Sequence, residues 1–275
     1  MRPSHLAGPA VLLACGLGGC TMFPAMAEPR VQMSPYFAAY QLRGEIALQN
    51  DPGTGPENNA PQSLRNFGFD RYEDDIGVRT DIGDGFAGFR LDYFRMTMNT
   101  SRRGFLDDDF GALLAGDFAG MSATMDEWRV SWLQPVVAAH TMFRDQQLDV
   151  QFAAGAVYTQ RDLSMHMRTD DGLRTQNLHV GGSNVYPAVR FRAGLPHLAL
   201  DVDYAISPEL NLGGEFDGTM QDVEARLAYS VPFQDVTLFA GWRYSTLVAS
   251  GHEGPLGFDA DLILDGFQFG FTVGF

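Results

Sequence analysis

The sequence predicts an all-β fold, a closed antiparallel up-and-down β-barrel of about ten strands. Two observations along the chain predict it: segments of alternating apolar and polar residues recur between Gly, Pro, Asn and Asp, and short and long connections alternate between them. A third is the final segment, 266–275, which alternates strictly and ends on Phe275. Because successive strand side chains point to opposite sides, one face of this last strand is wholly apolar.

Residues 1–27 read as an export signal ahead of a single barrel domain at 28–275. The segment has an early arginine, a short apolar stretch and a small-x-small cleavage site ending at Ala27. A second processing route also fits, because the Leu-Gly-Gly-Cys sequence that ends at Cys20 resembles a lipoprotein box in which Cys20 is acylated. The other cysteine, Cys15, lies in the same segment, so cleavage after Ala27 leaves a mature chain without disulfides.

Ten segments carry the period-two pattern of strands, with eight and twelve as alternative strand counts. They are 36–48, 75–82, 86–96, 125–143, 148–167, 185–193, 198–206, 222–233, 236–247 and 258–275. Tight turns are expected at 83–85, 144–147, 194–197 and 234–235. Longer links are expected at 49–74, 97–124, 168–184, 207–221 and 248–257. An even strand count then places both termini and all tight turns on one rim, the turn rim, and the longer links on the other, the loop rim.

One face of several strands is free of charge. These rows are Tyr36, Ala38, Tyr40, Leu42, Ile46 and Leu48; Leu148, Val150, Phe152, Ala154, Ala156 and Tyr158; Leu198, Leu200, Val202, Tyr204 and Ile206; Val236, Leu238, Ala240, Trp242 and Tyr244. In this register two aromatic girdles form, with Tyr93, Tyr158, Tyr204 and Tyr244 near the loop rim and Tyr36, Phe233 and Phe275 near the turn rim. Uncharged rows between aromatic girdles predict lipid on the outside of the barrel.

The opposite rows hold nine arginines and nine carboxylates, which predicts a packed, charge-paired lumen. Its main members are Arg43, Glu45, Arg79, Arg90, Asp92, Arg129, Asp149, Arg190, Arg192, Asp201, Asp203, Glu224, Arg226 and Arg243, with Asp75, Asp81, Glu127 and Arg161 in the same rows. Inside a narrow barrel such groups are desolvated, so each needs a partner. Small barrels fill their interiors with side chains, which disfavours a general diffusion pore.

The strand rhythm and the aromatic end at Phe275 resemble those of small bacterial outer-membrane β-barrels. The resemblance implies a location in the outer membrane of a Gram-negative cell envelope with both termini in the periplasm. It also implies contacts with outer-membrane lipids and lipopolysaccharide, and recognition of the terminal strand by the barrel assembly machinery. The oligomeric state does not follow from it.

Charge and motifs narrow the functional classes. The formal net charge is −15, which has the wrong sign for binding nucleic acid. No nucleophile elbow, zinc-binding His-Glu-x-x-His, P-loop or Cys-x-x-Cys pair occurs, so no catalytic, metal or cofactor site is predicted. We expect a structural or surface-interaction barrel; the alternative is a narrow solute or ion channel.

Two kinds of enzyme are weaker alternatives. The barrel resembles ten-stranded outer-membrane proteases of the omptin family, and a water-activating site at the loop rim would draw on His166, His179 and His252 with the acids of 107–109 and 170–171. Lipid-modifying barrels, which use Ser/His chemistry facing the lipid, are the other. Segment 105–125 is read as a short amphipathic helix, an extension of its flanking strands, or a loop folded into the barrel mouth.

Overall fold

The computed structural model describes residues 30–48, 59–207, 216–253 and 256–275. The predicted export signal at 1–27, with Cys20, lies outside them. The described chain forms ten long strands: β1 (Arg30–Leu48), β3 (Glu73–Gly83), β4 (Gly88–Phe105), β5 (Phe118–Phe143), β6 (Gln146–Thr169), β7 (Thr175–Gly194), β8 (Leu198–Ile206), β9 (Phe216–Ser230), β10 (Val236–Glu253) and β11 (Leu256–Gly274). A two-residue strand, β2 (Gln62–Ser63), and a 3₁₀ turn, η3 (Leu64–Phe67), lie between β1 and β3. No helix of the described residues has the length and apolarity to cross a membrane.

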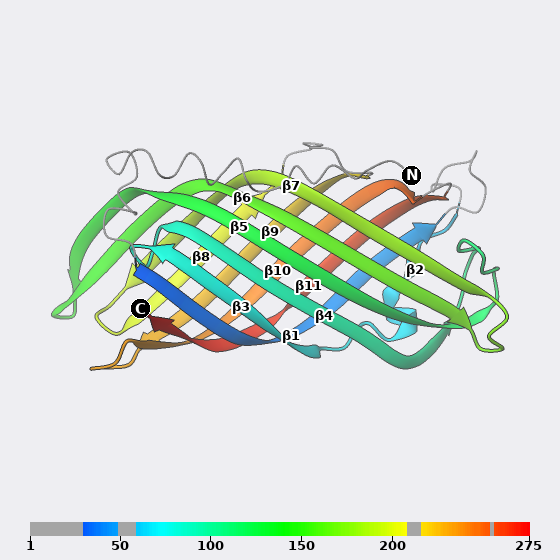
Figure 1. The fold of residues 1–275 in the computed structure, drawn as a ribbon, viewed down its shortest axis with the longest axis horizontal. Coiled ribbons are helices and arrows are strands. Elements are labelled where there is room, and N and C mark those ends of the chain that lie inside the picture. Colours follow the sequence, from blue (N-terminus) through cyan, green and yellow to red (C-terminus); the bar gives the residue numbers. More distant parts are fainter. Residues whose placement is uncertain (1–29, 49–58, 208–215, 254–255) are drawn as a thin grey trace.

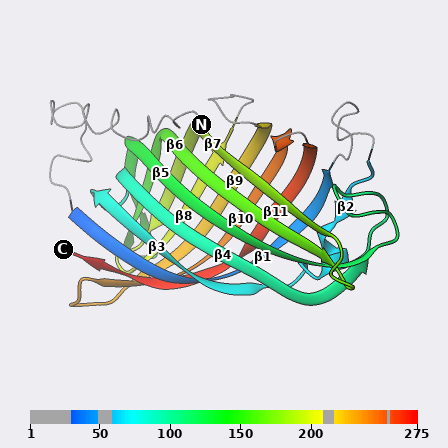
Figure 2. The same ribbon diagram turned by 45° about the vertical axis from the view of Figure 1, so that its right-hand side comes forward.

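The ten long strands form a closed antiparallel barrel. Each strand pairs with the next along the chain, β3 pairs back with β1, and β11 pairs with both β10 and β1 (Figures 1 and 2). Followed once around the ring, the pairings lead from Arg30 of β1 back to Leu42 of the same strand. An offset of this size tilts the strands by about 40° and leaves an interior narrow enough for side chains to fill.

The predicted fold class and the count of ten strands are confirmed, but several strands are longer than expected. β4 runs to Phe105, β7 begins at Thr175 and β10 runs to Glu253, so much of the expected loop sequence is strand. In segment 105–125, the two ends belong to β4 and β5, and the larger part between these strands, 106–117, contains turns and no helix.

The described chain ends lie on the turn rim, where the tight turns also gather. Gln32 pairs with Gly274 and Arg30 with Gly83, at the end of β1 opposite the loop rim. The C-terminus and the β5–β6 hairpin occupy the same end of the barrel in Figure 1. At the tip of that hairpin Arg144 and Asp145 have φ of 48° and 63°, as in the two-residue turns that match strand twist.

On the strands that continue past one level of the barrel, the apolar face changes sides at that level, as β4 and β6 show. On β4 the outward residues are Phe89, Leu91 and Tyr93 toward the turn rim but Arg95, Thr97 and Asn99 toward the loop rim. The inward residues change the opposite way, from Arg90 and Asp92 to buried Phe94, Met96 and Met98. On β6 the outward row likewise changes from Phe152, Ala154, Ala156 and Tyr158 to Gln160, Asp162, Ser164 and His166, and the inward row from Arg161 to Leu163, Met165 and Met167.

The level of this change is marked by outward aromatic residues, which we call the aromatic ring: Tyr93, Trp128, Tyr158, Tyr204, Trp242, Tyr244 and Phe267. Tyr93 pairs with Trp128, and Trp242 with Phe267. On β10 the apolar outward row from Val236 to the ring covers about 20 Å of barrel height at a usual tilt, close to the apolar band of membrane barrels. The barrel therefore spans a membrane between the turn rim and the aromatic ring, and the part beyond the ring, the loop-side extension, stands outside the hydrocarbon.

The predicted orientation of the first strand, β1, is wrong. Its row from Tyr36 to Leu48 faces the interior, where Tyr36 is 3% and Tyr40 1% exposed, and the outward row is Val31, Met33, Phe37 and Ala39. Tyr36 therefore belongs to no girdle. From Val31 to Leu42 both rows of this strand are uncharged, so the period of two cannot decide between them. The row with phenolic groups is the one that meets buried ionic partners.

The interior of the loop-side extension is an apolar core closed by two connections. Its walls include Leu42, Ile46, Met96, Met125, Met165 and Leu262. Leu64 and Phe67 of η3, together with Phe69, pack into this core from the β1–β3 connection, and Leu106, Phe110 and Leu113 pack into it from 106–117. We call the described parts of these two connections, 59–72 and 106–117, the cap. The cap fills the loop end of the lumen with side chains.

Candidate functional site

The membrane-spanning part of the lumen is centred on Arg79, whose side chain is 2% exposed. Its Nε and Nη2 donate to Asp92 at 3.0 and 2.7 Å, and its Nη1 and Nη2 donate to Glu224 at 2.8 and 2.9 Å. The Tyr36 hydroxyl also donates to Asp92 at 2.9 Å, and Gln268 to Glu224 at 2.7 Å. Because β3 and β9 are not neighbours in the sheet, the Arg79–Glu224 pair crosses the lumen.

A second group crosses the lumen nearer the aromatic ring. Arg243 of β10 donates through Nη2 to Glu127 of β5 at 2.5 Å and to Asp222 of β9 at 2.5 Å. Arg161 of β6 donates to the same Glu127 and, at 3.1 Å, to Ser245. The buried carboxylate of Glu127 thus accepts from arginines of β6 and β10 and connects opposite walls of the lumen.

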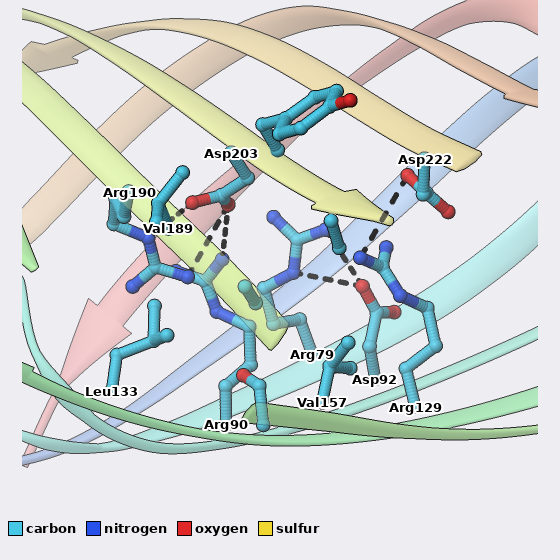
Figure 3. Close-up of a pocket in the computed structure, with 14 residues that line it drawn as sticks. Arg79, Arg90, Asp92, Arg129, Leu133, Val157, Val189, Arg190, Asp203 and Asp222 are labelled. Atoms are coloured by element: carbon cyan, nitrogen blue, oxygen red, sulfur yellow. Dashed lines mark hydrogen bonds and ion pairs between the residues drawn. The ribbon is translucent and has the colours of Figure 1, made fainter. Parts of the chain in front are cut away.

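A third group lies toward the turn rim. Arg90 bonds Asp81 at 2.5 Å and Asp203 at 2.9 Å, and Arg190 bonds Asp203 at 2.5 Å, as the dashed lines around Asp203 in Figure 3 partly show. Arg190 also donates to the carbonyl of Phe86 at 2.6 Å, so the β3–β4 turn is held over this end of the lumen. The lumen is therefore crossed by ion pairs at three levels.

Together these groups form what we call the lumen network. Among the described residues it contains eight arginines and seven carboxylates: Arg79, Arg90, Arg129, Arg161, Arg190, Arg192, Arg226 and Arg243, with Asp81, Asp92, Glu127, Asp201, Asp203, Asp222 and Glu224. Removing one partner of a buried pair leaves an uncompensated charge and costs about 3–5 kcal/mol. Arginine suits this interior because its planar fork pairs with two acceptors and stays charged.

Most of the predicted network residues come together here, but four do not: Arg43, Glu45, Asp149 and Asp75. Asp75 accepts a hydrogen bond from the N–H of Ile76 at 2.8 Å instead. Arg43 and Glu45 point outward on the loop-side extension, where Arg43 pairs with Asp265 at 2.7 Å. Asp149 lies on the β5–β6 hairpin at the turn rim, bonded to His140 at 2.6 Å and 42% exposed. The change of face at the aromatic ring explains the first two, since charges above the ring point toward water rather than into the lumen.

Asp222 was missed by the sequence reasoning, which used it only as a strand start. It accepts hydrogen bonds from Arg243 and is 2% exposed. The available signal was its spacing, because it stands two and four residues before Glu224 and Arg226 on the same face of β9.

The predicted rim site of histidines and acids is not assembled. His166 bonds Asn177 at 2.6 Å and His179 bonds Ser164 at 3.0 Å, both on the outer face of β6 and β7. Asp108 instead accepts from the N–H of Ala60 at 2.8 Å, an interaction that lowers the pKa of its carboxyl group. No group of three or more metal-binding side chains occurs among the residues that the structure describes.

The acids of the cap serve its own fold. Asp117 accepts from the N–H of Leu114 at 2.9 Å and from Arg174 at 2.6 Å. The Leu114 N–H first, and Arg174 second, hold the pKa of Asp117 below its usual value. The ion pair also ties 106–117 to the β6–β7 connection.

The predicted assembly signal, Phe275, lies at the turn rim with 81% of its surface exposed. Its N–H donates to the carbonyl of Val31 at 2.9 Å, so the last residue continues the seam between β11 and β1.

Comparisons with known proteins give resemblance in shape only. No protein-family model matches the chain, and no curated protein matches it. Among solved structures, the outer membrane protease OmpT from Escherichia coli is 9% identical with a TM-score of 0.38, over 90% of this chain and 97% of that one. The Pseudomonas putida toluene transporter TodX is 8% identical with a TM-score of 0.25, over 88% of this chain and 89% of that one. At these values neither comparison adds to what the strand pairings and the apolar outward rows already indicate, which is a closed antiparallel membrane barrel.

Proposed function

We propose that this protein is a non-conducting outer-membrane barrel with a structural or surface-interaction role, its termini in the periplasm and its loop-side extension outside the cell. The observation that carries the proposal is the double closure of the lumen. The lumen network crosses the membrane-spanning part, and the apolar core with its cap fills the part beyond the aromatic ring.

An ion entering from the turn rim meets the network first. It would have to separate pairs such as Arg79–Glu224, in which both side chains are 2% exposed. Each separation leaves charges without partners, at about 3–5 kcal/mol. Beyond them the ion would enter a core of Met and Leu side chains, where charges are not solvated.

The loop-side extension offers a surface for interaction. On β6 it continues from Tyr158 to Thr169, about 25–30 Å above the aromatic ring at the usual strand rise and tilt. Its outer face carries both signs of charge, including Arg43, Asp126 and Asp162. This height and polarity suit contact with the saccharides and phosphates of lipopolysaccharide, while the exposed end at Phe275 suits recognition by the assembly machinery.

Planar-bilayer recording of the purified protein tests the closed lumen. We expect no stepwise current from the wild type, and current from a variant in which Arg79 and Arg243 are both changed to alanine and Phe110 to glycine. Stable stepwise currents from the wild type, at levels insensitive to these changes, would instead favour the narrow channel.

A second candidate function rests on the Ser164–His179 hydrogen bond of 3.0 Å. Asp162 precedes Ser164 on the same outer face, and opposite it stands Gly181, where an added Cβ would lie 2.6 Å from Asp162 Oδ1 and 3.3 Å from His179 Nε2. Because Gly181 has no side chain, the Asp162 carboxylate and the His179 imidazole lie close together. A serine, an imidazole and a carboxylate beyond the lipid boundary are the groups that hydrolysis of a lipid ester requires.

Labelling with a fluorophosphonate, which reacts with activated serines, tests this second candidate in native membranes. Labelling that Ser164→Ala removes and the neighbouring Ser183→Ala leaves intact would support an esterase. Equal labelling of the wild type and Ser164→Ala would remove it.

A further inference from the structure

We propose that the lumen binds one small inorganic anion of halide size beside Arg129. The proposal concerns the interior of the membrane-spanning part and does not depend on what the loop-side extension contacts. It rests on the charge balance of the lumen network, on the hydrogen bonds of Arg129 and on a cavity next to it.

The charge balance leaves one positive charge in excess, since eight arginines face seven carboxylates in the network defined above. All seven of the other arginines donate a hydrogen bond to a carboxylate at 3.3 Å or less. A buried charge without compensation costs several kcal/mol, so an interior with this composition favours an additional anion.

Arg129 is the arginine that lacks such a bond. Its nearest carboxylate contacts are Asp222 at 3.8 Å and Glu224 at 3.7 Å, both beyond hydrogen-bond distance. Both carboxylates already accept from closer arginines, Arg243 and Arg79. The Nε–H of Arg129 is buried and has no acceptor. Figure 3 shows its guanidinium beside Asp92 and Asp222 at one side of the cavity.

The cavity has the size and lining of an anion site. Its volume is about 30 Å³, enough for one or two water-sized particles and too small for an organic solute. Four arginines line it, namely Arg79, Arg90, Arg129 and Arg190, against three carboxylates. Leu133, Val157 and Ala188 form apolar walls, which strengthen electrostatic attraction by lowering the local dielectric constant.

An anion fits these features better than a metal cation or a water molecule does. A metal cation would face four guanidinium groups. A water molecule would satisfy the Nε–H of Arg129 but would leave the excess charge in place. A halide accepts hydrogen bonds from several guanidinium groups and supplies the missing negative charge.

Crystals of the full chain soaked in bromide test the proposal directly. We expect an anomalous bromide peak in the cavity within hydrogen-bond distance of Arg129 in the wild type and in Arg192→Lys, which keeps the charge of the network, and none in Arg129→Gln. Arg192 is the matched control because it belongs to the network, pairs with Asp201 at 2.6 Å and does not line the cavity. A cavity holding only water in the wild type, or a peak that persists in Arg129→Gln, would overturn the proposal.

Unfolding in detergent gives a second readout. Bromide or chloride should raise the unfolding midpoint of the wild type and of Arg192→Lys relative to gluconate at equal ionic strength, because a ligand bound only to the folded state stabilises it. Arg129→Gln should show no halide-specific rise. Equal midpoints of the wild type in halide and gluconate would argue against the site.

Discussion

Replacing Arg79 with methionine should destabilise the barrel by about 3–5 kcal/mol at pH 7, because the substitution keeps a side chain in the space but leaves Asp92 and Glu224 without their shared cation. An independent bound agrees with this value. A buried carboxylate that has lost its cation can take up a proton instead of remaining charged. For an aspartate with a reference pKa near 3.9, this protonation costs about 4 kcal/mol at pH 7, so the penalty from that carboxylate cannot exceed about this value. At pH 5 the same protonation costs about 1.5 kcal/mol, so the penalty should shrink on acidification.

The assay is reversible denaturant unfolding of the barrel in lipid vesicles, followed by tryptophan fluorescence at both pH values. Arg95→Met is the control, since Arg95 is 58% exposed on the loop-side extension and its pair with Asp126 is 3.7 Å long, so its loss should cost at most about 1 kcal/mol. Adding Glu224→Gln to Arg79→Met should restore part of the loss. A single Arg79→Met variant within about 1 kcal/mol of the wild type, or a double variant less stable than the single one, would refute the reasoning.

Three further predictions concern other parts of the molecule. Ala240→Arg, in the middle of the lipid-facing row of β10, should cost about 2–4 kcal/mol of unfolding free energy, whereas Val248→Arg on the loop-side extension should cost close to nothing; lipid-vesicle unfolding measures both. Phe110→Ala should remove about 3–5 kcal/mol of packing from the cap and speed amide hydrogen exchange in 106–117, while exchange in the lipid-facing strands stays unchanged. The lowered pKa of Asp117 stabilises the cap above the unfolded-state value near 3.9, and this contribution is lost as pH falls through the folded-state value. Protection of 106–117 against exchange should therefore fall below about pH 4 in the wild type, and Asp117→Asn should weaken that pH dependence, with Asp108 supplying the remainder.

The sequence predicted the barrel and its ten strands because most of each strand follows a single period-two pattern. It also placed most of the lumen network, since charges such as Arg190 and Arg192 or Asp201 and Asp203 recur at every second residue. What it did not predict arises at the aromatic ring, where the environment on both faces changes. Above the ring, Met96 and Met98 face inward while Thr97 and Asn99 face outward, so the same alternation signals a strand but with its polarity reversed.

The same reversal explains the errors in detail. Arg43 follows the uncharged row of β1 but lies above the ring, so its charge indicated the wrong face for the whole strand. The ends of β4, β7 and β10 were placed too early because their polar outer faces resembled loops. The proposed halide site beside Arg129 had no signal in the sequence, because a buried Nε–H without an acceptor becomes visible only when its neighbours are placed in space.

The reversal of polarity at the aromatic ring also fixes the vertical position of the protein in the bilayer. Sliding the barrel inward by a few ångströms would carry Arg95, Asp126 and Asp265 from the interface toward the hydrocarbon, and basic residues at the midplane cost up to about 2–4 kcal/mol each. Sliding it outward would expose Trp128 and Phe267 to water, at 43% and 51% of their surfaces. Where the membrane is thinner or thicker than the apolar belt, the lipids must therefore adapt to the barrel rather than the barrel to the lipids.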